Sequence, residues 1–306
     1  MAIKRPEQMD FSQKSYTMII SGTPGLGKTT LALSAPDPIL FDFDQGIARV
    51  RAEHRTLTSE CETYADFLSD LKSPEVKASK SIILDTGGSL VQLMQPWAKQ
   101  QEPKAARDGR AMFGVIKREF DRLCAEIRHM NKNLIIIFHT TEQQKGDIIT
   151  QRLSCEGSAK DIVWTPADLG ANMFMMGKKR MLGFTPTEEY FAKSCYGIKG
   201  IMEVPELPAG AKNDFLTRLF EQATANIAAE MSQYTEERKT YDAAMQQGKE
   251  TIEKVVDAET ATIAAEALKN LSHALTSKAE LLSLLTDKTR SMGLKWDKKG
   301  GCYVAA

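Results

Sequence analysis

The chain has 306 residues, 42% of them hydrophobic, a composition typical of a globular protein that can bury a sizeable core. Its 40 Lys and Arg residues equal its 40 Asp and Glu residues, so a nucleic-acid-binding surface would have to be a local patch. No apolar run reaches membrane-spanning length and the N-terminus lacks a hydrophobic segment, which predicts a cytoplasmic protein with no membrane partner. The five cysteines form no CxxC pair, which indicates reduced thiols and argues against a structural zinc site.

Short apolar runs alternate with helical patterns over the first two thirds of the chain, which is typical of an α/β fold with a parallel sheet. The helical pattern is clearest at 113–130, where apolar residues recur at spacings of three and four. Several runs are rich in Ile, as strands buried on both faces are. We expect buried strands at 17–22, 38–44, 81–86 and 133–141.

The composition changes in the last third of the chain. Residues 213–288 are rich in Ala, Glu and Lys and predict helices, whereas 293–304 predict a strand, a Gly-containing turn and a second strand. We therefore expect an α/β domain over 1–210, with a mainly parallel central sheet flanked by helices. A mostly helical region that ends in a short β-hairpin should follow over 211–306.

A glycine-rich run joins the first predicted strand to a helix and fits G-x-x-x-x-G-K-[ST] in full. Its glycines allow a sharp turn, so that backbone N–H groups point at phosphate oxygens. Lys28 would reach the β- and γ-phosphates, and the Thr29 hydroxyl would ligate Mg²⁺. The alternative is a chance glycine-rich turn. The motif predicts binding of ATP and Mg²⁺ by Gly22, Thr23, Pro24, Gly25, Leu26, Gly27, Lys28, Thr29 and Thr30.

Carboxylates end the second and third predicted strands. Asp85 fits the second Mg²⁺ anchor that a P-loop requires, or it merely caps its strand. Thr86 follows, so the general base must come from elsewhere. Asp42 and Asp44 would share a face of an extended strand, where either could orient a water molecule. We favour Asp44; the alternative is that one of them caps the strand or binds backbone amides.

Over about residues 15–200 this order of features resembles the RecA-like ATPase core, and more closely a phage-encoded branch with single-strand annealing recombinases. The resemblance implies a RecA-like P-loop fold, assembly into a homo-oligomeric ring or filament, and a location in the host cytoplasm. RecA-like proteins carry a catalytic Glu after the second strand, so the resemblance gives this role to Asp44. Because Asp is one methylene shorter, slow or DNA-stimulated hydrolysis is expected.

The resemblance also implies roles for two residues beyond the P-loop. His139 ends the fourth strand, where such proteins carry a polar residue that senses the γ-phosphate; the alternative is a structural hydrogen-bonding histidine. Lys193 resembles the basic residue that these proteins extend into a neighbouring subunit's site to stabilise transition-state charge. The alternative is a solvated lysine. Competitors for the same task are Lys178, Lys179 and Arg180.

Two polar connections, 100–111 and 142–160, match the DNA-contacting loops of that core. Cations spaced along such loops suit the phosphates of single-stranded DNA, although solvated loops have the same composition. Neither connection contains an aromatic residue, so base stacking must be weak or come from elsewhere. The DNA-binding candidates are Lys104, Arg107, Arg110, Lys145, Arg152 and Lys160.

The terminal segment mixes cations with Trp296 and Tyr303, which suits either single-stranded nucleic acid or a capping hairpin with a core Trp and Tyr. As a whole, the sequence predicts an ATP-hydrolysing protein that binds single-stranded DNA and promotes annealing in phage recombination, with a single-strand-binding protein as a further partner. The main alternative is a P-loop ATPase that acts on protein partners, such as a helicase loader or assembly motor. A small-molecule phosphotransferase is a third possibility, but the sequence offers no arginine-rich lid.

Overall fold

The computed structural model describes residues 6, 9–145, 148–156 and 163–306. The chain divides into two compact units. The N-terminal unit is Asp10–Asn226, and the C-terminal unit is Ile227–Ala306 with the residues before Asp10. The division falls inside α7 (Phe215–Glu253), a helix of 39 residues that begins after the predicted domain boundary at 210. None of the helices in the described part of the chain combines the length and apolar character needed to cross a membrane.

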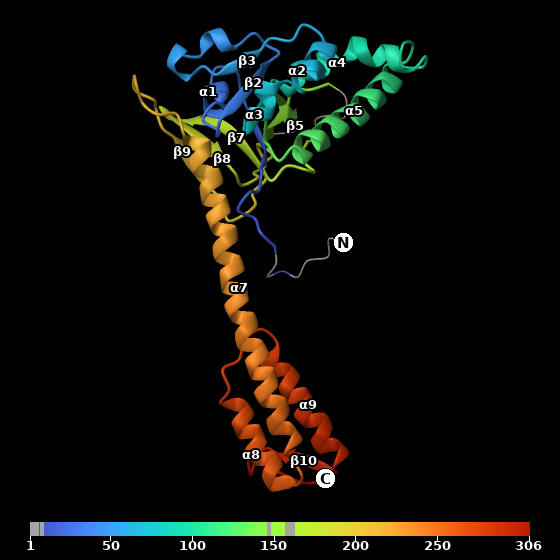
Figure 1. The fold of residues 1–306 in the computed structure, drawn as a ribbon, viewed down its shortest axis with the longest axis vertical. Helices are drawn as coiled ribbons and strands as arrows, with labels where there is room; N and C mark the ends of the chain where they lie inside the picture. Colours follow the sequence, from blue (N-terminus) through green and yellow to red (C-terminus); the bar gives the residue numbers. More distant parts are fainter. Residues whose placement is uncertain (1–5, 7–8, 146–147, 157–162) are drawn as a thin grey trace. The chain divides into compact units, whose positions relative to one another are not determined.

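A nine-stranded, mainly parallel sheet forms the centre of the N-terminal unit (Figure 1). The strand order is β3-β2-β4-β5-β1-β7-β8-β9, with β6 paired to β5 off this path. Pairing is parallel from β3 to β7 and antiparallel at β7–β8, β8–β9 and β5–β6. The strand bounds are β1 (Thr17–Gly22), β2 (Pro38–Asp42), β3 (Leu57–Ser59), β4 (Ser81–Asp85), β5 (Asn133–Lys145), β6 (Ile148–Leu153), β7 (Leu169–Met176), β8 (Lys179–Gly183) and β9 (Ile201–Val204).

Alternate residues of the central strands feed two separate hydrophobic clusters, one on each face of the sheet. Ile82 and Leu84 belong to the cluster under α2, α3, α4 and α5. Ile83 belongs to the cluster that α1 and the start of α7 complete. Burial on both faces explains the Ile-rich composition of these strands. The helix bounds are α1 (Lys28–Ala32), α2 (Tyr64–Asp70), α3 (Pro74–Ala78), α4 (Gly87–Gln101) and α5 (Gly109–His129).

The described parts of the two polar connections include regular secondary structure, where loops were expected. In the first, α4 continues to Gln101, and α5 begins at Gly109 because the Asp108 side chain accepts a hydrogen bond from the backbone N–H of Arg110. In the second, β5 extends to Lys145 and pairs with β6. In the sequence, a Gly-Asp pair separates the residues of β5 from those of β6. Such a pair is a hairpin signal, which the prediction of a loop over 142–160 did not use.

The C-terminal unit consists of the later part of α7, α8 (Ala258–Lys269), α9 (Ser277–Ser291) and a hairpin of β10 (Leu294–Asp297) and β11 (Cys302–Ala305). Its core includes Leu268, Leu281 and Leu285. Tyr303 packs against this core, whereas Trp296 is 45% exposed, so only the tyrosine fits the expectation of a buried aromatic pair. The predicted fold class is confirmed: a mainly parallel sheet flanked by helices, then a helical region ending in a β-hairpin.

Candidate nucleotide site

The loop between β1 and α1 has the shape that its glycines predict. Gly22, Gly25 and Gly27 have φ angles of 151°, 84° and 87°, which L-residues with a side chain rarely adopt. A Cβ atom at Gly22 would lie 2.5 Å from the carbonyl oxygen of Met173 in β7. The first glycine is therefore required by close packing as well as by its backbone angle.

The side chain of Lys28 lies under this loop and is 4% exposed. Its Nζ donates hydrogen bonds to the carbonyl oxygens of Gly22 (2.9 Å) and Thr23 (2.8 Å) and lies 3.1 Å from Nδ1 of His139. Burial lowers the pKa of the ammonium group to about 8, although the charges of Asp85 and Asp44 oppose this. A buried cation whose direct partners are two carbonyls and an imidazole has capacity to bind an anion.

Thr29 and Asp85, the two predicted Mg²⁺ ligands, are in direct contact. The Thr29 hydroxyl donates a 2.6 Å hydrogen bond to Oδ2 of Asp85, which is 5% exposed at the end of β4. Burial raises the pKa of the Asp85 carboxyl to about 6, and the nearby charge of Asp44 adds to this while the Thr29 hydrogen bond opposes it. A hydroxyl oxygen and a desolvated carboxylate fit the hard oxygen ligands that Mg²⁺ takes.

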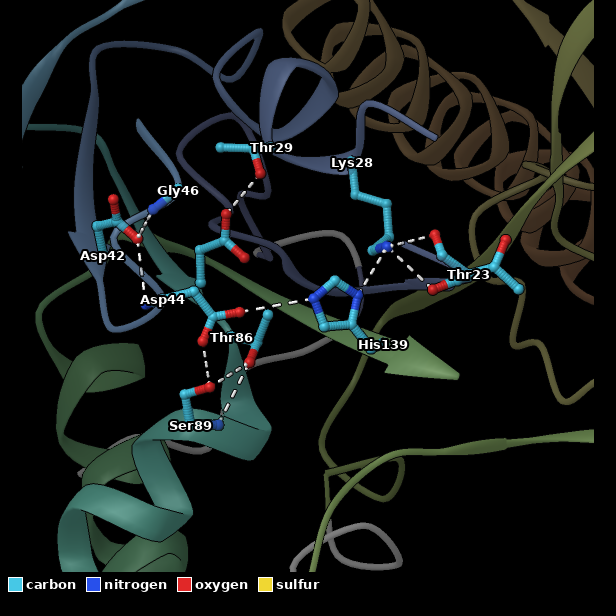
Figure 2. A network of polar contacts seen from close by, with 11 residues as sticks. Thr23, Lys28, Thr29, Asp42, Asp44, Gly46, Thr86, Ser89 and His139 are labelled. Atoms are coloured by element: carbon cyan, nitrogen blue, oxygen red, sulfur yellow. Dashed lines mark hydrogen bonds and ion pairs between the residues drawn. The ribbon is translucent and has the colours of Figure 1, made fainter. Parts of the chain in front are cut away.

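Asp44 belongs to the same network. Its Oδ2 lies 3.5 Å from Nε2 of His139, and its Oδ1 accepts a hydrogen bond from the Ser89 hydroxyl. These hydrogen bonds hold the pKa of Asp44 below its usual value, and the one from His139 has the largest effect. The carboxylate is therefore ionised at neutral pH. Figure 2 shows the His139 ring between Lys28 and Asp44. The imidazole therefore links the lysine of the P-loop motif to the expected catalytic carboxylate.

The sheet register explains how His139 reaches this position. His139 pairs with Gly22 in the parallel ladder between β5 and β1, so it lies beside the first glycine of the loop. Ser89 was not among the predicted site residues. It lies in the first turn of α4, where its backbone N–H donates to the N-cap hydroxyl of Thr86 at 3.2 Å. The sequence did offer a signal for Ser89 as a site residue, because it is a hydroxyl residue four positions after Asp85.

Asp42 has a structural role. Its carboxylate accepts backbone hydrogen bonds from Asp44 (3.2 Å), Gly46 (2.9 Å) and Ile47 (2.8 Å), and the side chain is 2% exposed. The expectation that Asp42 and Asp44 share a strand face is wrong, because β2 ends at Asp42 and the chain turns there. Asp42 holds this turn and thereby positions Asp44.

The remaining predicted cations have different surroundings, and Arg180 comes close to the P-loop itself. Lys193 Nζ donates to the carbonyl oxygens of Trp164 and Thr165, each at 3.1 Å, and its action on a neighbouring subunit remains a prediction. Lys179 pairs with Glu203 at 2.7 Å, and the Arg180 guanidinium carbon lies 4.0 Å from where a Cβ atom on Gly27 would be. Of the DNA-binding candidates, exposed side chains are presented by Lys104, Arg107, Arg110 and Arg152, whereas the Lys145 side chain and Lys160 lie outside the described residues.

Comparison with known proteins agrees with this geometry. Residues 14–196 match the family described as AAA domain. No curated protein matched by sequence. A KaiC-like protein from the hyperthermophilic archaeon Pyrococcus horikoshii OT3 is structurally similar at a TM-score of 0.36 and 14% identity, over 63% of this chain and 90% of that chain.

Because this structural similarity is weak, the fold is described from the strand order of the sheet itself. The P-loop strand β1 and the strand β4 that ends in Asp85 are separated by one strand, β5. The segment from the P-loop to β7 lies within the matched residues. The chain therefore belongs to the AAA domain family, with its P-loop between β1 and α1 of a mainly parallel sheet.

Proposed function

We propose that the N-terminal unit binds ATP with Mg²⁺ and hydrolyses it. The observation that carries this proposal is the continuous contact from Lys28 through His139 to Asp44, beside the hydroxyl–carboxylate pair of Thr29 and Asp85. Among the described residues, Lys28 is a buried cation without an anionic hydrogen-bond partner. Thr29 and Asp85 would hold the metal ion. Mg²⁺ bound there would neutralise phosphate charge.

In this proposal each side chain has a separate task. Asp44, ionised and held by His139 and Ser89, orients the attacking water and accepts its proton. Lys28 binds the β- and γ-phosphates and stabilises the negative charge that develops as water attacks the γ-phosphorus and ADP leaves. Because a phosphate competes with His139 for the Lys28 ammonium, nucleotide binding frees Nδ1 of the imidazole. His139 then differs between the empty and the loaded site, as a γ-phosphate sensor must.

We further propose that the protein binds single-stranded DNA and promotes annealing in phage recombination as a homo-oligomer, with a single-strand-binding protein as a partner. The support is the exposure of Lys104, Arg107 and Arg152 on the two polar connections. Strand β5 carries His139 near its middle, and its later residues pair with β6, so that Thr141 lies opposite Arg152. A change at His139 is thus adjacent in the backbone to a segment expected to touch DNA.

The test is single-stranded DNA binding with and without ATP over a range of salt concentrations, together with ATP hydrolysis. We expect Lys28→Ala to reduce hydrolysis by at least about 10²-fold, because it removes preorganised charge stabilisation, and to abolish the ATP dependence of DNA binding. Lys80→Ala is the matched control, since the Lys80 side chain is 70% exposed and pairs with Asp37 on the surface.

The outcomes separate the two parts of the proposal. Binding of DNA should weaken steeply with salt if phosphates are contacted. An unchanged protein that hydrolyses ATP but binds no single strand in any nucleotide state would contradict the DNA role and favour an ATPase that acts on protein partners. Normal hydrolysis by Lys28→Ala would contradict the nucleotide site itself.

A further inference from the structure

A cavity of about 1290 Å³ lies in the N-terminal unit beside the later part of β5. Its wall includes Ser21 and Thr140, which adjoin Gly22 and His139 of the nucleotide site in the sequence. It also includes residues of β6 and the segment 190–193. The backbone N–H of Gln151 in β6 donates a 2.6 Å hydrogen bond to the Glu189 carbonyl, which fastens β6 to that segment.

Two aromatic rings meet on the wall of this cavity. The ring centroids of Trp164 and Phe191 are 4.7 Å apart at an interplanar angle of 58°. Trp164 is fixed in place, because its ring covers Gly170 so closely that a Cβ atom there would lie 2.2 Å from it. Lys193 bonds the Trp164 carbonyl and its backbone pairs with Gly170. Phe191, by contrast, is 53% exposed. Its ring therefore packs against the indole on one side and remains accessible to solvent elsewhere.

The wall also contains a buried amide with an unused donor. Asn172 is 1% exposed and its Oδ1 accepts a 3.1 Å hydrogen bond from Ser21. Its Nδ2 has no hydrogen-bond partner among the residues that the structure describes. A buried donor of this kind is normally satisfied, and because Asn172 lines the cavity, its amide is available to a polar group that enters there. Further amides on the wall come from Gln143 and Gln151.

We propose that this cavity receives bases of single-stranded DNA, with Phe191 stacking on a base and Trp164 supporting it from behind. The inference rests on the proposed DNA-binding function and deepens it, because it supplies the aromatic contact that the two polar connections lack. Stacking on an aromatic side chain and amide contacts to base edges are how proteins hold unpaired bases.

The charges on the wall determine how this contact should behave. Arg152 and Lys193 are matched there by Glu142 and Glu156. The cavity therefore contributes stacking rather than net attraction for phosphates, so that the cations of the first connection supply most of that attraction and Arg152 adds a local contact. Stacking is independent of counterion release, so removing it should weaken binding equally at all salt concentrations.

The test measures the affinity of the full-length protein for oligo(dT) at several salt concentrations. We expect Phe191→Ala to weaken binding by about tenfold or more and to leave the slope of log affinity against log salt unchanged, whereas Phe191→Tyr retains the affinity. Met176→Ala, in β7 of the same unit and 56% exposed in the unchanged protein, is the control for loss of an exposed apolar side chain. ATP hydrolysis without DNA should be the same in all three variants.

A second readout uses the indole itself. In a protein with Trp97→Phe and Trp296→Phe, oligo(dT) should quench the fluorescence of Trp164, and Phe191→Ala should reduce that quenching. If the unchanged protein binds oligo(dT) while Phe191→Ala binds it equally well, the cavity proposal is wrong and the DNA role stands. If the unchanged protein binds no single strand, the DNA role fails, and the cavity proposal fails with it.

Discussion

The two units of this chain differ in where they keep their charged residues. Among the described residues of the N-terminal unit, Lys28, Asp42 and Asp85 are each at most 5% exposed. The buried polar residues described in the C-terminal unit are Ser277 and Thr289, both uncharged. Burying a charge is unfavourable unless a partner compensates, so buried charges concentrate where a ligand is bound. The contrast indicates that nucleotide chemistry belongs to the first unit, whereas ordinary apolar packing stabilises the second.

The largest effect expected inside the N-terminal unit comes from Asp44→Asn. Removing the ionised carboxylate while keeping its size should lower kcat for ATP hydrolysis by about 10²- to 10³-fold, because general-base assistance is lost. ATP affinity should change little, since Lys28 and the loop remain. Asp37→Asn is the control, because the Asp37 side chain is 64% exposed and pairs with Lys80 on the surface. Unaltered kcat in Asp44→Asn would move the catalytic carboxylate elsewhere.

The converse effect is expected in the C-terminal unit from Leu281→Ala. Leu281 is fully buried and packs on α7 so closely that a Cβ atom on Gly248 would lie 2.4 Å from it. The substitution should lower the unfolding free energy of this unit by about 3 kcal/mol, as cavity-forming substitutions do. Leu282→Ala, at the adjacent 44% exposed position, should leave it nearly unchanged.

Thermal unfolding and ATP hydrolysis measured on the same Leu281→Ala samples test the comparison directly. We expect the C-terminal transition to move to lower temperature while kcat stays the same below it. A proportional loss of hydrolysis would show that the two units do not divide stability and chemistry in this way.

The smallest effect concerns a buried polar contact outside the nucleotide site. Tyr64 is 1% exposed and its hydroxyl donates to Glu119, which also binds Arg122. The Arg122 hydrogen bond holds the pKa of Glu119 below its usual value. Glu119→Gln should therefore lower the unfolding free energy by about 1 kcal/mol at neutral pH without changing hydrolysis.

The pH dependence of this effect has a definite sign. A carboxyl with a lowered pKa in the folded state contributes its stability above the pKa of the unfolded chain and loses it as the pH falls through the folded value. The difference between Glu119→Gln and the unchanged protein should thus shrink in acid, as measured by urea unfolding from neutral pH down to about pH 3. Glu126→Gln, which keeps Tyr64 and Glu119 intact, is the control, and a difference that grows in acid would contradict the assignment.

Most of the nucleotide site could be predicted from the sequence, because a complete local motif fixes the loop and a parallel sheet brings the ends of its strands together. Lys28, Thr29, Asp44, Asp85 and His139 do converge in space. The roles given to Asp44 and His139 remain predictions. Contacts between side chains from separate elements could not be foreseen.

Three misses illustrate this limit. Ser89 reaches Asp44 only because α4 begins immediately after β4. Asp42 binds backbone amides, as the alternative for the two carboxylates allowed, but apolar periodicity does not reveal that the strand ends there. Trp164 and Phe191 are distant in sequence, and their rings meet only after β7 has joined the sheet beside β1.

Helix α4 connects the network around Asp44 to the first polar connection. Its first turn holds Ser89, and Lys104 follows shortly after its last residue, Gln101. A helix of 15 residues is about 22 Å long, so a rotation of about 5° at the first turn would displace the last turn by about 2 Å. Such a displacement is enough to make or break a hydrogen bond. If loss of the Ser89–Asp44 hydrogen bond let the first turn rotate, leverage alone would move the cations at the far end of the helix.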